Sequence, residues 1–392
     1  MRKYILSILI LLLIATIGCA PTAVEKTKEG YLNPKDAGAY NHRGIAYDEK
    51  GQHDKAIADF AKAIELNPKY AEAYSNRGIA YGEKGQFDQA ISDHSKAIEI
   101  NPRLAGAYYN RGNVYKDKGQ YDKAISDYSK AIELNPKYAD GYNNRGNAYD
   151  EKGQYDKAIA DYTKAIEITP KFAEAYNNRG VAYDAKGQHD KAIADYRSAI
   201  EIDPRYVEAY YNCGIAAYIK GHYDQAISDY GKAIEIDPDN GWAYYNRGIA
   251  YDEKGQHDKA IADFAKAIEL NSKFAEAYNN RGNAYNDKGQ YDKAISDYSQ
   301  AIELNPKDAD AYNNRGLVLS YKGDYDQSIA DFTKAIEINP NLASAYNNRA
   351  VACYIKGEYD KVWDDVRKAQ SLGFQVHPEF LKALREDPGK QK

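Results

Sequence analysis

The chain repeats itself with a period of 34 residues, and this periodicity constrains its fold more than any other feature. The 25 residues of 43–67 recur letter for letter at 247–271, a distance of 204 residues, or six periods. The motif Tyr-x-Asn-Arg-Gly and its variants mark ten units. The units are 37–70, 71–104, 105–138, 139–172, 173–206, 207–240, 241–274, 275–308, 309–342 and 343–376. Self-similarity of this kind predicts stacked structural repeats, each packed on its neighbours.

Each unit is predicted to form two helices joined by a turn. In the first unit, small and apolar residues recur at helical spacing on both sides of Gly51. Glycine recurs at this turn in all ten units, where it allows the left-handed conformation that ends a helix. Asp54 is expected to cap the second helix, and Asn67-Pro68 to end it. Local sequence therefore predicts a helical hairpin in every unit.

This pattern resembles the tetratricopeptide repeat (TPR), because the spacing, turn glycine, small residues and proline all agree over 340 of the 392 residues. The resemblance implies an all-α fold, a right-handed TPR superhelix (α-solenoid) of ten helix-turn-helix repeats whose first helices line a concave groove. Residues 377–392 are expected to supply a C-terminal capping helix and a polar tail. The apolar residues expected to cover the last hydrophobic face are Phe374, Val376, Phe380, Leu381 and Leu384.

Arg43 and its equivalents depart from the commonest TPR pattern, which has leucine at this position. An aspartate such as Asp59 recurs in every second helix. We expect the arginine stems to pack between helices and the guanidinium groups to meet these aspartates, a structural role. In the sixth unit Cys213 replaces the arginine.

Residues 1–18 are predicted to be a signal peptide. Arg2 and Lys3 precede a short apolar run, which is too short to be identified confidently as a spanning helix. Residues 15–19 (Ala-Thr-Ile-Gly-Cys) resemble a bacterial lipobox, in which the cysteine, here Cys19, is lipidated and the chain is cut before it. Thr16 departs from the leucine usual there, and the alternative is an ordinary signal with an incidental cysteine.

The residues that follow the predicted signal peptide indicate where in the cell the protein would be located. Residues 19–36 are polar and are predicted to be a tether. Ala20 follows the cysteine, and a residue other than aspartate there is usual for outer-membrane sorting. The expected location is the cell envelope, with a lipid anchor in the outer membrane facing the periplasm. The alternative is a secreted or periplasmic protein after signal cleavage.

Composition and motifs give no indication of catalysis, metal binding or nucleic-acid binding. Lysine and arginine total 53 against 58 acidic residues, and the net charge of −5 offers no basic face for nucleic acid. His53, His189 and His257 share a repeat position but are separated by whole units, so no metal site is expected. The three cysteines are too scattered for a disulfide framework. No phosphate-binding, serine-hydrolase or zinc-protease motif occurs. No catalytic residue or cofactor is predicted, and the chain is not expected to be an enzyme.

Asparagine precedes the motif arginine, or the residue that replaces it, in units two to ten. TPR geometry places this position at the groove, where each amide offers a donor and an acceptor to an extended peptide backbone. The arrangement resembles the asparagine ladder of the O-GlcNAc transferase repeat domain. The alternative is that these side chains cap or bridge neighbouring helices. The residues are Asn76, Asn110, Asn144, Asn178, Asn212, Asn246, Asn280, Asn314 and Asn348.

The sixth unit breaks the pattern, and apolar residues there and in the seventh unit predict a binding hot spot. The residues are Tyr211, Ile215, Tyr218, Ile219, Trp242, Tyr245 and Ile249. The alternative is a trace of duplication, because residues 354–357 repeat the letters of residues 218–221.

The favoured function is a non-enzymatic protein-protein interaction scaffold anchored in the envelope. Its groove is expected to bind an extended peptide or partner protein of neutral to basic charge, because acidic residues such as Glu49, Glu151 and Glu253 lie nearby. The alternative is a self-associating structural protein of the envelope. An enzyme would need a cofactor or turnover that nothing in the sequence indicates.

Overall fold

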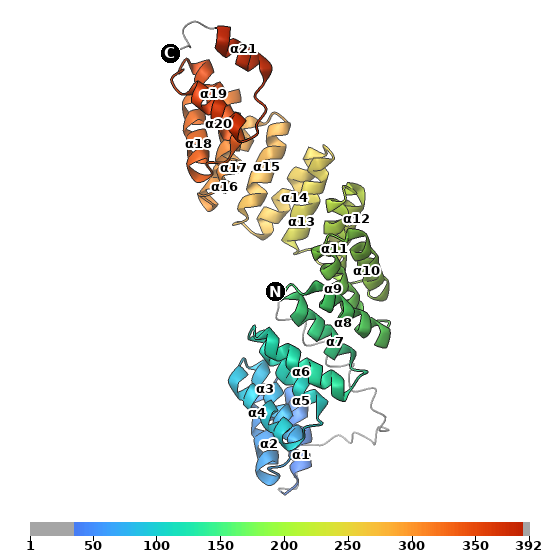
Figure 1. The fold of residues 1–392 in the computed structure, drawn as a ribbon. Helices are drawn as coiled ribbons and strands as arrows, with labels where there is room; N and C mark the ends of the chain where they lie inside the picture. Colours follow the sequence, from blue (N-terminus) through green and yellow to red (C-terminus); the bar gives the residue numbers. More distant parts are fainter. Residues whose placement is uncertain (1–34, 387–392) are drawn as a thin grey trace. The chain divides into compact units, whose positions relative to one another are not determined.

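The protein is built from helices, as Figure 1 shows for a computed structural model. The structure describes residues 35–386, in which there are 21 helices and no strand. The chain divides into two units, 1–119 and 120–392, at the turn within the third repeat. The predicted all-α fold of helix-turn-helix repeats is confirmed.

The first helices of the ten repeats are α1 (Ala37–Asp48), α3 (Ala71–Glu83), α5 (Ala105–Asp117), α7 (Ala139–Asp150), α9 (Ala173–Ala185), α11 (Val207–Ile219), α13 (Gly241–Glu253), α15 (Ala275–Asp287), α17 (Ala309–Tyr321) and α19 (Ala343–Lys356). The second helices are α2 (His53–Leu66), α4 (Phe87–Ile100), α6 (Tyr121–Leu134), α8 (Tyr155–Ile168), α10 (His189–Ile202), α12 (Tyr223–Ile236), α14 (His257–Leu270), α16 (Tyr291–Leu304), α18 (Tyr325–Ile338) and α20 (Val362–Ser371). A final helix, α21 (Pro378–Glu386), follows.

The turn between the helices of a repeat depends on its glycine. Gly51 has a φ of +70°, a left-handed conformation that glycine adopts without steric cost. The N–H of Gln52 then donates to the carbonyl of Tyr47 (2.9 Å). The expectation that Asp54 caps α2 is wrong: α2 begins at His53, and Asp54 lies inside its first turn. Its carboxylate instead binds the Lys84 ammonium of the next repeat.

A glycine on the first helix faces an aromatic ring on the second. A Cβ added at Gly44 would lie 2.6 Å from the ring of Phe60, which is fully buried. The tenth repeat reverses these sizes, because Ala350 replaces the glycine and Val366 the ring, and both are buried in one cluster. Close approach of the helices is thus retained by a matched change of volume.

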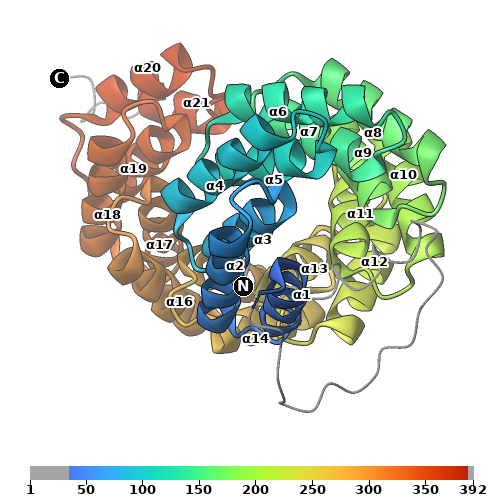
Figure 2. The ribbon, with the colours of Figure 1, turned by 90° about the horizontal axis from the view of Figure 1, so that it is seen from below.

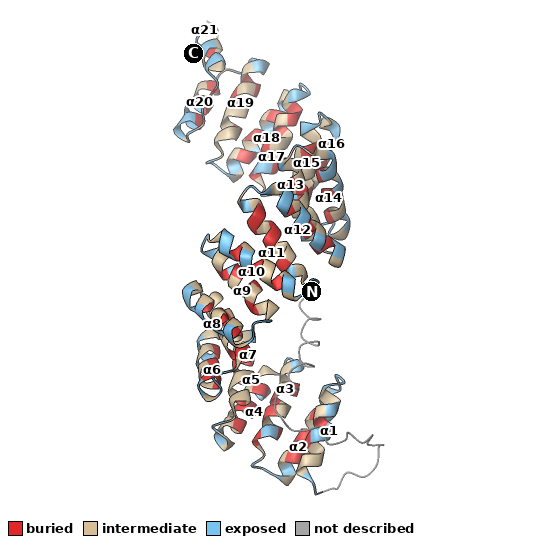
Figure 3. Ribbon diagram, turned by 90° about the vertical axis from the view of Figure 1, so that its right-hand side faces the viewer, coloured by how far each residue is buried: buried red, intermediate tan, exposed pale blue. Residues whose placement is uncertain are grey.

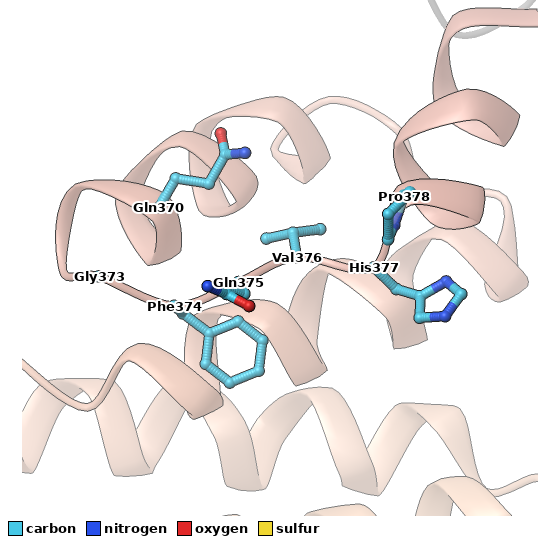
Figure 4. A pocket seen from close by; sticks show the side chains of 7 residues that line it. All are labelled: Gln370, Gly373, Phe374, Gln375, Val376, His377 and Pro378. Carbon is cyan, nitrogen blue, oxygen red and sulfur yellow. The ribbon is translucent and has the colours of Figure 1, made fainter.

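The C-terminal end is closed as expected. Val376 and Leu384 are buried in the cluster of the tenth repeat, and Phe374, Phe380 and Leu381 pack against it. The last helix begins only at Pro378, so the two residues of this set at 374 and 376 lie in the segment before it (Figure 4). These contacts cover apolar surface that the last repeat would otherwise expose.

Within the second unit, α7, α9 and α11 lie on the inner side of the curve of helices, and α8, α10 and α12 on the outer side (Figure 2). Figure 3 shows that buried positions run along α11, where five residues are buried. None of the described helices is long and apolar enough to cross a membrane. The signal segment and Cys19 lie outside the described residues.

Candidate functional site

The asparagine ladder lies on the first helices, and its side chains are half-buried. In seven of the nine, the amide nitrogen donates to a side-chain oxygen of the preceding repeat. The bonds are Asn76 to Asn41 (3.0 Å), Asn178 to Asn143 (3.2 Å), Asn212 to Asn177 (3.1 Å), Asn246 to Tyr211 (2.8 Å), Asn280 to Tyr245 (2.9 Å), Asn314 to Asn279 (3.3 Å) and Asn348 to Asn313 (3.1 Å). These asparagines therefore bridge repeats, the alternative that the sequence left open.

The bridging occupies the amides to different extents. An asparagine amide has two N–H donors and an oxygen acceptor. Asn178 donates to Asn143 and to Asn147, so both of its donors are engaged within the protein. Asn212 donates to one partner, Asn177. Peptide binding by the ladder stays a prediction, and Asn110 and Asn144 occupy the same position on α5 and α7.

Bidentate ion pairs join the two helices within repeats, as expected. Nε and Nη2 of the arginine donate to the two carboxylate oxygens at 2.6 to 2.9 Å. The pairs are Arg43–Asp59, Arg77–Asp93, Arg145–Asp161, Arg179–Asp195, Arg247–Asp263, Arg281–Asp297, Arg315–Asp331 and Arg349–Asp365. Nη1 of Arg145 also donates to Ser129 of the preceding repeat (3.0 Å). Hydrogen bonding to the aspartate raises the pKa of Arg145.

In the sixth repeat the aspartate is Asp229, and its arginine partner comes from the fifth repeat. Asp229 is 2% exposed and binds both terminal nitrogens of Arg197 (2.7 and 2.6 Å). Arg197 lies on α10 of the fifth repeat, where the other repeats have Ala, Ser, Thr or Gly, except the tenth. Cys213 is a buried free thiol whose pKa is raised to about 12, first by burial and then by Asp229. The sequence analysis did not predict the Arg197–Asp229 pair, although an arginine at position 197, where most repeats have a small residue, could have indicated it.

The predicted hot-spot residues fall into two clusters. Tyr211, Ile215 and Tyr218 pack against buried Tyr230 and its neighbours, with 5.9 Å between the ring centroids of Tyr211 and Tyr230. Ile219 is 56% exposed at the end of α11. Ile249 is half-buried on α13. This cluster is therefore largely part of the core between α11 and α12.

The second cluster presents an aromatic ring to solvent. Trp242 is 58% exposed at the start of α13 and packs against Phe274, with 4.6 Å between ring centroids and 60° between the ring planes. Tyr245 contacts both rings, and its hydroxyl accepts the hydrogen bond from Asn280. Phe274 is 4% exposed, so it forms a buried base for the tryptophan. Sequence reasoning did not include Phe274 because it belongs to the link between two repeats.

Histidines of repeats 1, 5 and 7 bind an aspartate of their own repeat. The pairs are His53–Asp48 (2.7 Å), His189–Asp184 (2.9 Å) and His257–Asp252 (2.7 Å). In the seventh repeat Asp287 of the next repeat joins the pair, and one ligand atom from each residue lies within 4.8 Å of the others. The histidines are separated by whole units as expected, but the expectation that potential metal ligands do not converge is wrong here, because it compared the histidines only with one another.

Charged residues also join successive repeats at the turns. A lysine of each repeat from the second to the tenth pairs with an aspartate of the repeat before it. Glu49, Glu83, Glu151 and Glu253 lie beside these turns and are exposed. The preference for a neutral to basic partner, which was inferred from these acidic residues, stays a prediction.

A shallow hollow lies between α20 and α21. It is lined by Gln370, Gly373, Phe374, Gln375, Val376, His377 and Pro378 (Figure 4). Phe374 points toward the helices beneath, and His377 points away from the segment that carries it. Because two of these side chains belong to the closing apolar cluster, we assign the hollow to the end of the solenoid.

Stacked helical hairpins joined by side-chain bridges define the protein as an α-solenoid of the helical-repeat class. Profiles described as TPR repeat match residues 47–85, 80–119, 112–153, 146–187, 216–255 and 282–323. Two profiles described as tetratricopeptide repeat match 173–206, 241–274 and 309–342, and 264–296 and 332–363. The chain belongs to the tetratricopeptide repeat family, whose members are generally non-enzymatic scaffolds that bind proteins or peptides.

Solved structures include similar chains. The crystal structure of MamA is 34% identical over 41% of this chain and 95% of MamA, with a TM-score of 0.39. YrrB, described as a TPR protein with an unusual peptide-binding site, is 29% identical over 47% of this chain and 95% of YrrB, with a TM-score of 0.41. Yeast Tom70 is 16% identical over 90% of this chain and 98% of the other, with a TM-score of 0.42. The comparison with curated sequences found no match.

Proposed function

We propose that the protein is an envelope-anchored scaffold whose seventh repeat binds a protein partner through Trp242. The observation that carries this proposal is a large exposed ring held on a buried aromatic base. Aromatic residues supply much of the energy at protein interfaces, and a ring already held in place loses little conformational entropy on binding. The family match supports a protein partner.

The partner is a segment with basic side chains. Glu253 and Glu276, at opposite ends of neighbouring first helices, are exposed. Glu276 lies close enough to Tyr245 to raise the pKa of that hydroxyl further, although burial is the larger cause. A lysine or arginine on the partner could stack on the Trp242 ring on the side of Tyr245 and Glu276. Binding should weaken with added salt, because the exposed carboxylates are screened.

The asparagine ladder would extend this contact along the solenoid. Where an amide oxygen or second N–H is left by the bridge to the preceding repeat, it could pair with the backbone of an extended peptide. Each such bond contributes about 0.5–1.5 kcal/mol net. In this proposal Trp242 anchors the partner and the ladder aligns it.

Replacing Trp242 by alanine is expected to weaken partner binding at least tenfold, because the ring, exposed in the free protein, would be buried against the partner at the centre of the interface. The measurement is a crosslinked pull-down from membranes with the full chain, followed by binding of the recovered partner to purified variants. Tyr321→Ala is the matched control, since Tyr321 is equally exposed, at 58%, in another repeat. Equal loss in both variants, or recovery of this chain alone, would refute the site and favour self-association.

The anchor is proposed from the signal-like segment and its lipobox-like end. We expect radiolabelled palmitate to label the full chain and not a Cys19→Ala variant, because the lipid that carries the acyl groups would be attached to the Cys19 sulfur. The variant should also leave the membrane fraction. Cys213→Ala serves as the control, since Cys213 is buried and should not affect labelling. Labelling that persists in Cys19→Ala would place the modification elsewhere.

A further inference from the structure

Three potential metal ligands meet where the seventh repeat contacts the eighth. Asp252 lies near the end of α13, His257 is the first residue of α14, and Asp287 is the last residue of α15. One ligand atom from each lies within 4.8 Å of the others, and His257 Nδ1 is 2.7 Å from Asp252 Oδ1. The first two side chains are half-buried and Asp287 is exposed. The cluster is therefore reachable from solvent.

The donor atoms match a particular class of ion. One imidazole nitrogen and two carboxylate oxygens form a mixed set that suits zinc and related first-row divalent metals. Zinc binds histidine nitrogen at about 2.0–2.1 Å and carboxylate oxygen at about 2.0–2.2 Å. Ions that prefer oxygen alone, such as calcium and magnesium, would gain little from His257.

The apo cluster also brings two carboxylates together. Asp252 and Asp287 each contribute a carboxylate oxygen to the cluster, and two negative charges this close repel each other. A cation between the carboxylates would remove this repulsion. The two aspartates come from different repeats, so an ion bound to both would connect α13 with α15.

Two other repeats have the aspartate–histidine pair. In repeat 1 Glu83 follows Asp48 and His53 at the position equivalent to Asp287, but these three do not bring ligand atoms within 4.8 Å of one another. Repeat 5 has the same aspartate–histidine pair in Asp184 and His189, but Ile219 occupies the position equivalent to Asp287. Repeat 4 has Asp150 at the position equivalent to Asp252, but Tyr155 stands in place of the histidine. Among the residues that the structure describes, three ligand atoms this close together occur at Asp252, His257 and Asp287.

We propose that Asp252, His257 and Asp287 form a site for a divalent metal ion of the zinc class that ties repeat 7 to repeat 8. Water completes the coordination, because three protein ligands leave a position open. Metal bound at this place stabilises the contact between the two repeats by mass action. The site is independent of the partner surface at Trp242.

Isothermal titration calorimetry of the full chain with ZnCl₂ tests the site. We expect His257→Gln to weaken the tightest zinc-binding event at least tenfold and to abolish its stabilising shift in melting temperature. His189→Gln is the matched control and should leave both unchanged, because its pair lacks the third ligand. Equal effects of the two substitutions, or no zinc binding by the unmodified chain, would overturn the proposal.

His257→Gln could lose zinc binding because the variant misfolds. A second variant that is expected to gain a zinc site excludes this explanation. Ile219→Asp should add a second zinc site, because it supplies the missing carboxylate beside His189 and Asp184. With Co²⁺ in place of zinc, each site should give visible absorption from a nitrogen- and oxygen-ligated ion. Absence of both the added site and the cobalt spectrum would contradict the assignment.

Discussion

Replacing Arg197 by alanine is expected to destabilise the contact between repeats 5 and 6 by about 3 kcal/mol, at the lower end of the cost of breaking a buried ion pair. Asp229 is 2% exposed, and the variant would leave its carboxylate without the two charged hydrogen bonds that it now accepts. The Arg197 side chain is 38% exposed, so solvent reaches part of the pair and the lower end of the range applies.

The effect should be local, because each repeat of a solenoid contacts mainly its neighbours. Hydrogen exchange of peptides from α10 to α12 is the appropriate measurement, and amides in these helices should exchange faster in Arg197→Ala. Arg367→Ala is the matched control: Arg367 has the equivalent position in the tenth repeat, but its partner Asp364 is exposed. Unchanged protection of α10 to α12 would show that Asp229 does not depend on Arg197.

A double substitution tests the compensation directly. Arg197→Ser combined with Cys213→Arg restores the arrangement of the fourth repeat, where Arg145 binds Asp161 and donates to Ser129. Cys213→Arg alone adds a second guanidinium to a place that Arg197 already occupies, so it should destabilise. The double variant should recover most of the protection lost in Arg197→Ala. Failure to recover would mean that the cysteine has a packing role of its own.

The elements that sequence could predict are those set by neighbouring residues. Gly51 at the turn, the helical spacing around it and Asn67 at the end of α2 act over a few residues, and the hairpin follows from them. The Arg43–Asp59 pair could also be predicted, because both residues recur in step with the repeat. The assignment of Asp54 as a cap failed because the N-cap is Gln52, two residues earlier.

Contacts between repeats were harder to predict. Arg197 and Asp229 lie 32 residues apart at unlike repeat positions, so the pair is not visible as a recurring motif. The asparagines posed a different difficulty: their spacing fits peptide binding and bridging equally well, and the packing distance between helices decides which hydrogen bonds form. Trp242 was identified from sequence, but its base, Phe274, was not.

Lowering the pH is expected to destabilise the second repeat through His94. This residue replaces the aromatic ring of other repeats and is 1% exposed opposite Gly78. Burial, and after it the positive charge of Arg111, lower the pKa of His94 from 6.5 to about 3. The hydroxyl of Ser75 lies 3.4 Å from its Nδ1. The imidazole is therefore neutral in the folded protein at every pH above about 3.

The sign of the effect follows from proton binding. Between the folded pKa of about 3 and the unfolded pKa near 6.5, the unfolded chain binds one more proton than the folded chain. The stability due to neutral His94 is complete above the unfolded value and falls as the pH drops through this window. From pH 7.5 to pH 5.0 the loss is about 2 kcal/mol.

His94→Phe should remove this loss, because phenylalanine already packs opposite glycine at Phe60 in the first repeat and does not titrate. The measurement is the pH dependence of hydrogen exchange in α3 and α4, taken as the difference between the unmodified chain and the variant, with intrinsic exchange rates corrected for pH. This difference cancels the carboxylates and other histidines, which both proteins share. A parallel loss of protection in both proteins on acidification would exclude His94 as the cause, and a loss confined to the unmodified chain would establish it.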